Sequence, residues 1–390
     1  MRILFVTDHA GTPGGAEKSL ITLIRKLIRR GHEVYCILPQ HGETYNMLAS
    51  YGVKIKIMPM PVITRKYNPF KIAYWLLSLI FFGVVAGIWC RLKEIDIIHV
   101  NKTPCVFYGV ITSAVAWLPV IWHVRNFNRR FGIIGRIIYR HVDAVVCISH
   151  AIAKPFFEYF ADSRDKIQVV YNGVYIDPLK KISVRSENIL KELGIAKPVF
   201  IVGVVGRITA WKKIEVFLHA MHRIMQQNSG KAIYGVVIGD CVTSKEQQMQ
   251  DDIAYKNYLM TVHEKLQLQD KVRFINFKED IETYIGELDM LVLPSENEPF
   301  GRVIIEAMAL GVPVIAANSG AVPEIVIHNE TGVLFPLGND KSLAEEILRL
   351  YHDPLLLRRI AKDGWKRTHD YFSADICADN MEKLYESILV

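Results

Sequence analysis

Residues 291–325 read LVLPSENEPFGRVIIEAMALGVPVIAANSGAVPEI. An apolar run ends at Pro294, an acidic polar loop follows, a helical stretch begins at Gly301, and a second apolar run covers 314–317. Apolar runs with little alternation indicate strands that are buried on both faces, as in a parallel sheet covered by helices. The stretch therefore predicts one strand-helix-strand unit of a doubly wound α/β domain.

The same alternation of short apolar runs and helical segments occurs twice along the 390 residues. In the first half we predict strands at 2–7, 33–39, 53–58, 96–101, 120–124, 143–149 and 167–172. The segment 178–198 is polar, basic and bounded by prolines, which is typical of a linker. The pattern then restarts, with strands predicted at 200–206, 234–239, 272–275, 290–293, 314–317 and 332–335.

We therefore expect an α/β protein with two Rossmann-like domains. The N-terminal domain covers 1–178, the linker 179–198 and the C-terminal domain 199–372, and a helix at 373–390 packs back on the N-terminal domain. Two such domains would face each other across a cleft at the carboxyl ends of their strands. Ligands of this architecture bind there.

Composition restricts the class of protein. With 51% hydrophobic residues, the chain is long enough for two cores of ordinary size. The six cysteines show no paired spacing, so neither a disulfide framework nor a zinc site is indicated. The first strand begins at once and leaves no room for a secretion signal, so we expect a cytoplasmic location.

The charge is unevenly placed. Residues 1–178 hold 22 Lys and Arg against 11 Asp and Glu, whereas residues 179–390 hold 25 against 29. The N-terminal half is therefore the basic one. Such asymmetry suggests an anionic partner, either nucleic acid or lipid headgroups.

One long apolar stretch is unusual for a soluble protein. Residues 72–90 (IAYWLLSLIFFGVVAGIWC) carry no charge and would form a helix of roughly 28 Å, about the thickness of a bilayer core. A true span would place the strands on its two sides across the membrane from each other. We therefore favour a helix that packs on the sheet or lies in the membrane interface.

The loop GTPGGAEKS, residues 11–19, resembles a phosphate-binding loop at first sight. An ATP-binding loop needs a lysine directly after its last glycine, but Lys18 follows Glu17, and Gly11 lies seven residues before it. A carboxylate beside the phosphates would also repel them. An ATPase is therefore excluded by spacing and by chemistry.

Two glutamates flank the start of the helix at Gly301. Glu298 precedes it and can project over the helix N-terminus, whose free N–H groups attract phosphate, while Glu306 lies on the second turn. Their carboxylates can accept hydrogen bonds from sugar or ribose hydroxyls. The alternative is that Glu298 only caps the helix and Glu306 is solvated. Glu306, however, stands among apolar residues, where an idle carboxylate would be unfavourable.

A basic turn follows the first strand of the C-terminal domain. It reads Gly206-Arg207-Ile208-Thr209-Ala210-Trp211-Lys212-Lys213. Arg207 offers a bidentate donor and Lys212 a point charge, which suits the neutralisation of a diphosphate leaving group. Solvated surface charge is the alternative, because loops are where charge is usually solvated.

Together these motifs resemble the retaining, nucleotide-sugar-dependent glycosyltransferases of family 4, which have the GT-B fold. The resemblance rests on Gly206-Arg207-x4-Lys212, on the Glu298-x7-Glu306 pair, and on Ser319-Gly320-x2-Pro323-Glu324. It covers nearly the whole chain, with GGAE at 14–17, DIIHVN at 96–101, WHVRN at 122–126, CIS at 147–149, YNGV at 171–174 and TGVLFP at 331–336 in the family's order. Lys213 departs from it, because the family usually has glycine there.

The resemblance implies a role for each matching residue. Glu306 would bind the ribose hydroxyls, and Glu298 with the backbone of Phe300 and Gly301 would hold the donor sugar. Arg207 and Lys212 would stabilise the departing diphosphate, the task that a metal ion performs in other transferases. The chain has no Asp-x-Asp motif, so we expect no metal and no other cofactor.

The remaining site residues are expected around the same donor. His123, at the end of the strand VIWHV, would contact the transferred sugar, and Arg125 would bind an anionic part of the acceptor. A satisfied histidine at a strand end is the alternative for His123. Gly14 and Gly15 would let backbone come close to the donor's diphosphate. The nucleotide base is expected near Phe277, largely against backbone.

These observations favour a retaining glycosyltransferase acting on a glycan or lipid-linked acceptor. The apolar stretch 72–90 and the basic cluster Arg25, Lys26, Arg29 and Arg30 suggest a peripheral enzyme at the inner face of the cytoplasmic membrane, without a nucleic-acid partner. The alternatives are a nucleotide-sugar 2-epimerase of the same fold, or a non-catalytic protein that binds membrane or nucleic acid.

Overall fold

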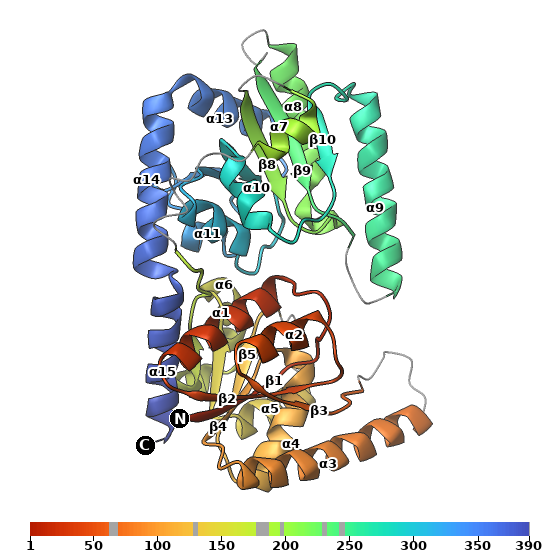
Figure 1. Cartoon of the computed structure of the whole chain (residues 1–390), viewed down its shortest axis with the longest axis vertical. Helices are drawn as coiled ribbons and strands as arrows, with labels where there is room; N and C mark the ends of the chain where they lie inside the picture. Colours follow the sequence, from red (N-terminus) through yellow and green to blue (C-terminus); the bar gives the residue numbers. More distant parts are fainter. Residues whose placement is uncertain are drawn as a thin grey trace. The chain divides into compact units, whose positions relative to one another are not determined.

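The computed structural model places the chain in two compact units. The described residues are 1–61, 69–127, 132–176, 187–195, 199–227, 232–241 and 246–389. The N-terminal unit comprises Met1–Gly173 and Ser373–Val390, and the C-terminal unit comprises Val174–Phe372 (Figure 1). Both chain termini therefore belong to the N-terminal unit.

The N-terminal unit is built on a parallel sheet of seven strands in the order β3-β2-β1-β4-β5-β6-β7. The inner strands are apolar and mostly buried, as expected for a sheet covered on both faces, whereas the two edge strands are more exposed. Their bounds are β1 (Arg2–Val6), β2 (Glu33–Leu38), β3 (Lys54–Ile57), β4 (Ile97–Val100), β5 (Val120–Val124), β6 (Ala144–Cys147) and β7 (Ile167–Val169).

Helices connect and cover these strands. They are α1 (Gly15–Arg29), α2 (Glu43–Ser50), α3 (Pro69–Leu92), α4 (Val106–Ala116), α5 (Ile133–His141) and α6 (His150–Tyr159), with short 3-10 turns η1 (Thr103–Cys105) and η2 (Ala161–Lys166). The last helix of the chain, α15 (Ala374–Leu389), completes the unit. Its Met381 and Tyr385 are buried in the same apolar core as Ile3 and Phe5 of β1.

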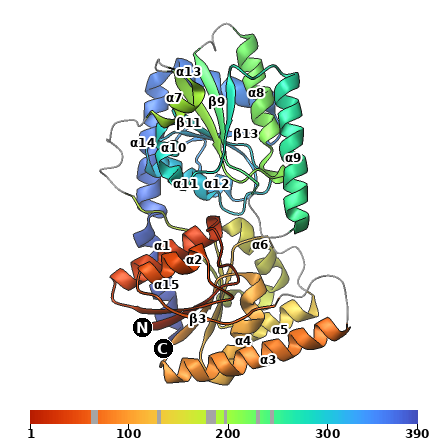
Figure 2. The same cartoon turned by 45° about the vertical axis from the view of Figure 1, so that its right-hand side comes forward.

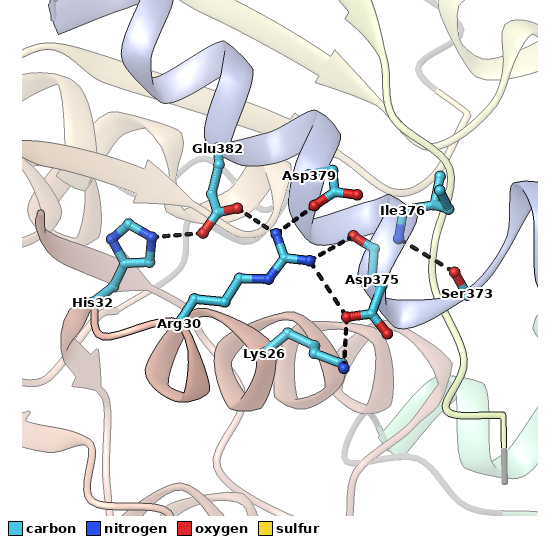
Figure 3. Close-up of polar contacts among 8 residues, drawn as sticks. All are labelled: Lys26, Arg30, His32, Ser373, Asp375, Ile376, Asp379 and Glu382. Carbon is cyan, nitrogen blue, oxygen red and sulfur yellow. Dashed lines mark hydrogen bonds and ion pairs between the residues drawn. The ribbon is translucent and has the colours of Figure 1, made fainter.

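Ion pairs hold α15 against α1 (Figure 3). Arg30 donates to Asp379 at 2.6 Å and also pairs with Glu382, while Lys26 lies 2.7 Å from Asp375. Burial alone would lower the pKa of Arg30, but the carboxylates of Glu382 and Asp379 raise it on balance. Each pair is partly exposed, so the network fixes the position of α15 more than it adds stability.

This network corrects one prediction. The basic cluster on α1 was expected to face anionic lipid, but Lys26 and Arg30 are neutralised by carboxylates of α15. Arg25 lies over the ring of Tyr51, at 4.6 Å from its centroid. Two of the four residues of the cluster therefore bind the protein's own C-terminal helix, and the excess positive charge of the N-terminal half is smaller at its surface than the sequence suggests.

Helix α3 contains the apolar stretch and is the only described helix that is long and apolar enough to cross a membrane. It packs along α4, where a Cβ atom on Gly83 or Gly87 would collide with Ile111 or Val115. The strands before and after this helix, β3 and β4, belong to the same sheet. The helix therefore packs on the outside of its unit and does not separate the two strands. Only 28% of its most apolar window is buried.

The C-terminal unit has a parallel sheet of six strands in the order β10-β9-β8-β11-β12-β13. The strands are β8 (Phe200–Val205), β9 (Ile233–Ile238), β10 (Val272–Ile275), β11 (Met290–Leu293), β12 (Val314–Ala317) and β13 (Val333–Phe335). The helices are α7 (Asn188–Leu193), α8 (Ile214–Gln226), α9 (Glu246–Lys265), α10 (Ile281–Glu287), α11 (Arg302–Ala309), α12 (Val322–Ile325), α13 (Asp340–His352) and α14 (Pro354–Tyr371), with the 3-10 turn η3 (Ala210–Lys212).

All thirteen predicted strands are present, and the predicted fold class is confirmed. The largest difference is at β7, which ends at Val169 rather than at 172. Part of the predicted linker is folded, because Ile189 of α7 is buried and its N–H donates to the Glu287 carboxylate at 2.7 Å. Residues 179–186 and 196–198 of that linker lie outside the described residues.

Candidate active site

The site of the C-terminal unit follows from its strand order. The order reverses between β8 and β11, which are neighbours in the sheet. Loops that leave neighbouring parallel strands at such a switch point lie side by side and form the usual ligand site of this architecture. The basic turn follows β8 and the Glu298 loop follows β11, so the fold brings together two predicted motifs that are 86 residues apart.

Lys212 and Glu298 form an ion pair at this point. Lys212 Nζ lies 2.8 Å from Glu298 Oε2, and both side chains are at least 87% buried. The ammonium also lies 4.2 Å from the centroid of the Trp211 ring, a cation–π contact. Glu296 N–H donates to the Trp211 carbonyl at 2.8 Å, which ties the two loops together.

The Glu298 loop reaches α11 through backbone that favours glycine. Gly301 has φ +88° and caps α11, and no side chain caps the helix there. A Cβ atom on Gly320 would lie 2.4 Å from the Glu298 carbonyl, so the next loop can pack closely only with glycine at this position. The N-terminus of α11 therefore keeps its positive end for an anionic ligand.

Two of the other predicted donor contacts lie on this helix or directly before it. Glu306 is on α11 as predicted and accepts from Arg302 Nε at 2.7 Å. Phe300 is buried, 3% exposed, against Phe372. Phe277, in the loop after β10, is 42% exposed, so its ring has a free surface.

Arg207 lies at the end of β8, next to a close contact of two loops. Gly206 and Gly239 have φ of +146° and +151°, and a Cβ atom on Gly239 would lie 2.0 Å from the Gly206 carbonyl. Arg207 Nε lies 3.7 Å from Asp252 Oδ2 of α9, beyond hydrogen-bond distance. Asp252 was not predicted, because a lone carboxylate on a polar helix gives no signal in the sequence.

The structure explains the one departure from the family pattern. Lys213 adopts a left-handed backbone, with φ +52° and ψ +40°, and caps α8. This is the conformation for which glycine is usual. The turn therefore keeps the glycine-type shape although a lysine occupies it.

His123 lies on β5 in the N-terminal unit and is 2% exposed. Its Nδ1 lies 2.9 Å from His99 Nε2, and His99 Nδ1 lies 2.7 Å from the Tyr385 hydroxyl. Burial, with the positive charge of Arg125, lowers the pKa of His99 to about 3 and holds the pKa of His123 well below its usual range. Both imidazoles are therefore neutral. His99 and Tyr385 were not predicted.

Arg125 is buried, 4% exposed, and its guanidinium is fixed by two amides. Its Nε donates to Asn101 Oδ1 at 2.7 Å and one terminal nitrogen donates to Asn172 Oδ1 at 2.8 Å. Asn101 follows β4 and Asn172 follows β7, so the arginine bridges loops at the carboxyl edge of the sheet. Its predicted contact with the acceptor stays a prediction.

The loop with Gly14 and Gly15 begins α1. Glu17 accepts from Gly14 N–H at 3.1 Å and pairs with Lys102, which follows β4. Burial raises the pKa of Glu17, but the Lys102 ammonium lowers it by more. The pKa therefore lies below its usual value. Glu17 therefore caps its own helix, and a Cβ atom on Gly15 would meet open space.

No group of three or more His, Cys, Asp or Glu side chains in the described ranges is placed to hold a metal ion. The residues assembled at the carboxyl edge of the C-terminal sheet are a lysine, an arginine and glutamates. Such a set can bind a diphosphate and sugar hydroxyls by charge and hydrogen bonds.

Two family models match the chain. The model "Glycosyltransferase Family 4" matches residues 13–177, and "Glycosyl transferases group 1" matches residues 185–367. Among curated proteins, the N-acetyl-alpha-D-glucosaminyl L-malate synthase of Bacillus anthracis is 25% identical, over 96% of this chain and 94% of its own. The putative glycosyltransferase YtcC of Bacillus subtilis is 29% identical, over 77% and 74%.

Solved structures share the whole fold. A glycosyltransferase from Rickettsia africae superposes with a TM-score of 0.83 at 22% identity, over 100% of this chain and 98% of its own. Alr3699/HepE from Anabaena, solved with UDP and glucose, superposes with a TM-score of 0.78 at 24% identity, over 99% of both chains.

The fold and these matches define the protein as a glycosyltransferase of the GT-B fold. The chain belongs to glycosyltransferase family 4, the group 1 glycosyl transferases. The family and fold predicted from the sequence are confirmed. The relatives named above give no support to the 2-epimerase hypothesis or to a non-catalytic binding protein.

Proposed function

We propose that the protein is a retaining hexosyltransferase that uses a nucleotide-sugar donor and needs no metal ion. The observation that carries this proposal is the Lys212–Glu298 pair beside the N-terminus of α11, which no side chain caps. A diphosphate that binds there meets a lysine, Arg207 and the positive end of a helix. These groups stabilise the negative charge that develops on the leaving group.

The reaction requires one bond to break and one to form. The bond between the anomeric carbon and the diphosphate oxygen breaks, the acceptor oxygen bonds to the same carbon from the same face, and the acceptor proton passes to the leaving diphosphate. Lys212 and Arg207 have the chemistry to neutralise that diphosphate. Glu306 can accept hydrogen bonds from the ribose hydroxyls.

UDP-sugars are the first donors to test, because Alr3699/HepE was solved with UDP and with UDP-glucose. Purified protein is incubated with UDP-, GDP- and ADP-hexoses in EDTA, and NMR follows the anomeric configuration of the released or transferred sugar. We expect turnover of one donor class, with the donor's configuration kept and full activity in EDTA. An inverted product contradicts the retaining mechanism, and loss of activity in EDTA contradicts metal independence.

We also propose that the acceptor is a glycan or lipid-linked sugar, and that the enzyme works at the inner face of the cytoplasmic membrane in cell-surface polysaccharide or glycolipid synthesis. The curated relative CapM of Staphylococcus aureus, a capsular polysaccharide biosynthesis glycosyltransferase, is 31% identical over 49% of this chain. The structural support is α3, whose outer face exposes apolar side chains: Tyr74, Leu77, Ile80, Phe81, Val84 and Ile88.

The shape of this surface suits a lipid interface. In Figures 1 and 2, α3 runs along α4 on the outside of the unit, and α5, which also packs on α4, exposes Ile133, Ile134 and Ile137. Lys71 lies at one end of α3, and Arg91 and Lys93 lie at the other, all exposed. Basic residues at the ends of an exposed apolar helix can reach lipid phosphates while the apolar face enters the acyl region.

Liposome flotation tests this surface. The double variant Leu77→Asp, Phe81→Asp should lose affinity for vesicles that contain anionic lipid. Leu355→Asp, which changes an equally exposed leucine on α14 of the other unit, should bind as the wild type does. Recovery of the wild-type protein wholly in the soluble fraction, without affinity for these vesicles, would contradict the membrane proposal.

A further inference from the structure

A row of three hydrogen-bonded side chains crosses the core of the N-terminal unit. It joins Tyr385 of α15, His99 of β4 and His123 of β5 through contacts of 2.7 and 2.9 Å. Tyr385 and His99 have no exposed surface. The row ends at His123 Nε2, a buried atom without a hydrogen-bond partner in the part of the chain that the structure describes.

The protons of this row can be assigned by counting donors and acceptors. Each imidazole carries one proton, because burial and Arg125 keep the pKa of both rings low. His99 Nδ1 is the only acceptor that the described residues offer to the Tyr385 hydroxyl. A buried donor left without an acceptor costs about 1–3 kcal/mol, so the hydroxyl donates to His99 Nδ1.

The rest of the row follows from that first bond. Since His99 Nδ1 accepts, the His99 proton is on Nε2, and this N–H donates to His123 Nδ1. His123 must then carry its own proton on Nε2, the atom that has no partner. The opposite assignment would leave two buried groups without a partner among the described residues, the Tyr385 hydroxyl proton and the His123 Nε2 lone pair, whereas this one leaves only the His123 Nε2–H.

We propose that Tyr385 and His99 are positioning residues that hold His123 as its Nε2–H tautomer, so that His123 acts as a neutral hydrogen-bond donor to an oxygen of the transferred sugar. The inference rests on the proposed function, in which His123 contacts that sugar. In this tautomer Nε2 cannot accept the acceptor's proton, which leaves that proton to the departing diphosphate. The C-terminal helix thus sets the chemistry of a residue more than 250 positions earlier in the chain.

The tautomer can be observed directly in the ligand-free protein. In 15N-histidine-labelled protein, protonated and unprotonated ring nitrogens give separate NMR signals, assigned with His99 and His123 variants. We expect Nε2–H for both rings at neutral pH. Tyr385→Phe removes only the hydroxyl, so His99 should populate both tautomers, His123 should follow it, and kcat should fall about 10-fold or more.

Tyr108→Phe is the matched control. Tyr108 is a buried tyrosine of the same unit whose hydroxyl donates to the Pro61 carbonyl at 2.5 Å. Its loss should destabilise the unit to a similar extent while leaving the His123 signals and kcat unchanged. If Tyr385→Phe lowers kcat more than Tyr108→Phe does, the difference is not caused by a loss of folded protein.

Substitution of the middle residue gives a rescue test. His99→Gln places an amide that can accept from Tyr385 and donate to His123, so it should keep the Nε2–H tautomer and most of kcat. His99→Leu can do neither and should lose both. An Nδ1–H His123 in the wild type, or equal kcat in the Tyr385→Phe and Tyr108→Phe variants, would overturn the proposal. If no donor is turned over, the proposed function fails, while the NMR signals still decide the tautomer.

Discussion

Both units place a buried lysine–glutamate pair where the strand order reverses, but the two pairs are built in opposite ways. In the N-terminal unit the carboxylate, Glu17, follows β1 and the lysine, Lys102, follows β4. In the C-terminal unit the lysine, Lys212, follows β8 and the carboxylate, Glu298, follows β11. The same topology therefore carries the same two charges in exchanged positions.

This exchange is the reason why we propose that the C-terminal unit holds the diphosphate. Glu17 also accepts from Gly14 N–H, so the carboxylate already satisfies the N-terminus of its own helix. Glu298 contacts Lys212 but does not cap α11. An anion that binds at α11 would therefore meet a helix N-terminus that no side chain caps, beside a lysine that pairs with Glu298. The capped N-terminus of α1 agrees with the exclusion of an ATP-binding loop from the sequence.

The largest expected effect is the loss of catalysis when Lys212 is replaced, compared with the replacement of Lys102. Lys212→Met should lower kcat/KM by about 100-fold or more, because it removes a preorganised charge at the leaving group. Lys102→Met should lower the free energy of unfolding, because Glu17 is left buried without its cation, but should change kcat/KM by less than about 3-fold. Steady-state kinetics and urea unfolding of both variants measure this. Equal kinetic losses would contradict the assignment of the diphosphate to the C-terminal unit.

The second comparison concerns pH. The pKa of folded His99 is about 3, below its unfolded value of 6.5, so unfolding takes up a proton and stability falls as the pH drops from about 6.5 towards 3. The slope can reach about 1.4 kcal/mol per pH unit for each such histidine. Urea unfolding at pH 7 and pH 5.5, probed separately in each unit, should therefore show the N-terminal unit weakening first. His99→Gln should flatten this slope, and a slope equal to that of the wild type would refute its origin in His99.

A smaller effect is expected on donor affinity. Glu306→Ala should weaken binding of the nucleoside diphosphate about 10-fold, because the ribose hydroxyls lose their acceptor. Glu17→Gln, in the other unit, should reduce stability and leave the dissociation constant unchanged. Isothermal titration calorimetry gives both constants, and unchanged affinity in the Glu306 variant would remove its ribose role.

The smallest expected effect is on the turn after β8. Lys213→Gly should raise the free energy of unfolding of the C-terminal unit by up to about 1 kcal/mol, because a left-handed lysine is strained relative to glycine. Donor affinity should change little, since Lys213 pairs with Glu296 and not with Glu298. A destabilised variant would show that the lysine side chain contributes more than its backbone strain removes.

The strands were predictable because strands of a parallel sheet are buried on both faces and read as short apolar runs. The two motifs of the C-terminal site could be recognised in the sequence, and their contacts with a diphosphate and a sugar stay predictions. That Lys212 and Glu298 bind each other was not, because only the strand order brings their loops together.

The missed residues share a physical cause. His99 is a single side chain of a strand and Tyr385 a single side chain of a helix. The apolar pattern that predicts a strand or a helix does not show which distant residue forms a hydrogen bond with it. The predicted contact of Lys26 and Arg30 with lipid was wrong for the same reason. The carboxylates that neutralise these two residues lie on α15, far along the chain. A run of charges in the sequence shows that the charges exist, while the fold decides what they pair with.

Hydrogen exchange with and without a bound nucleoside diphosphate shows which unit holds the diphosphate. The ligand is the one among UDP, GDP and ADP that raises the melting temperature most, since binding to the native state alone stabilises it. If the diphosphate binds the C-terminal unit, amide exchange should slow at 206–214 and 298–305. Slower exchange confined to 12–19 of the N-terminal unit, with no change in the two C-terminal segments, would contradict it.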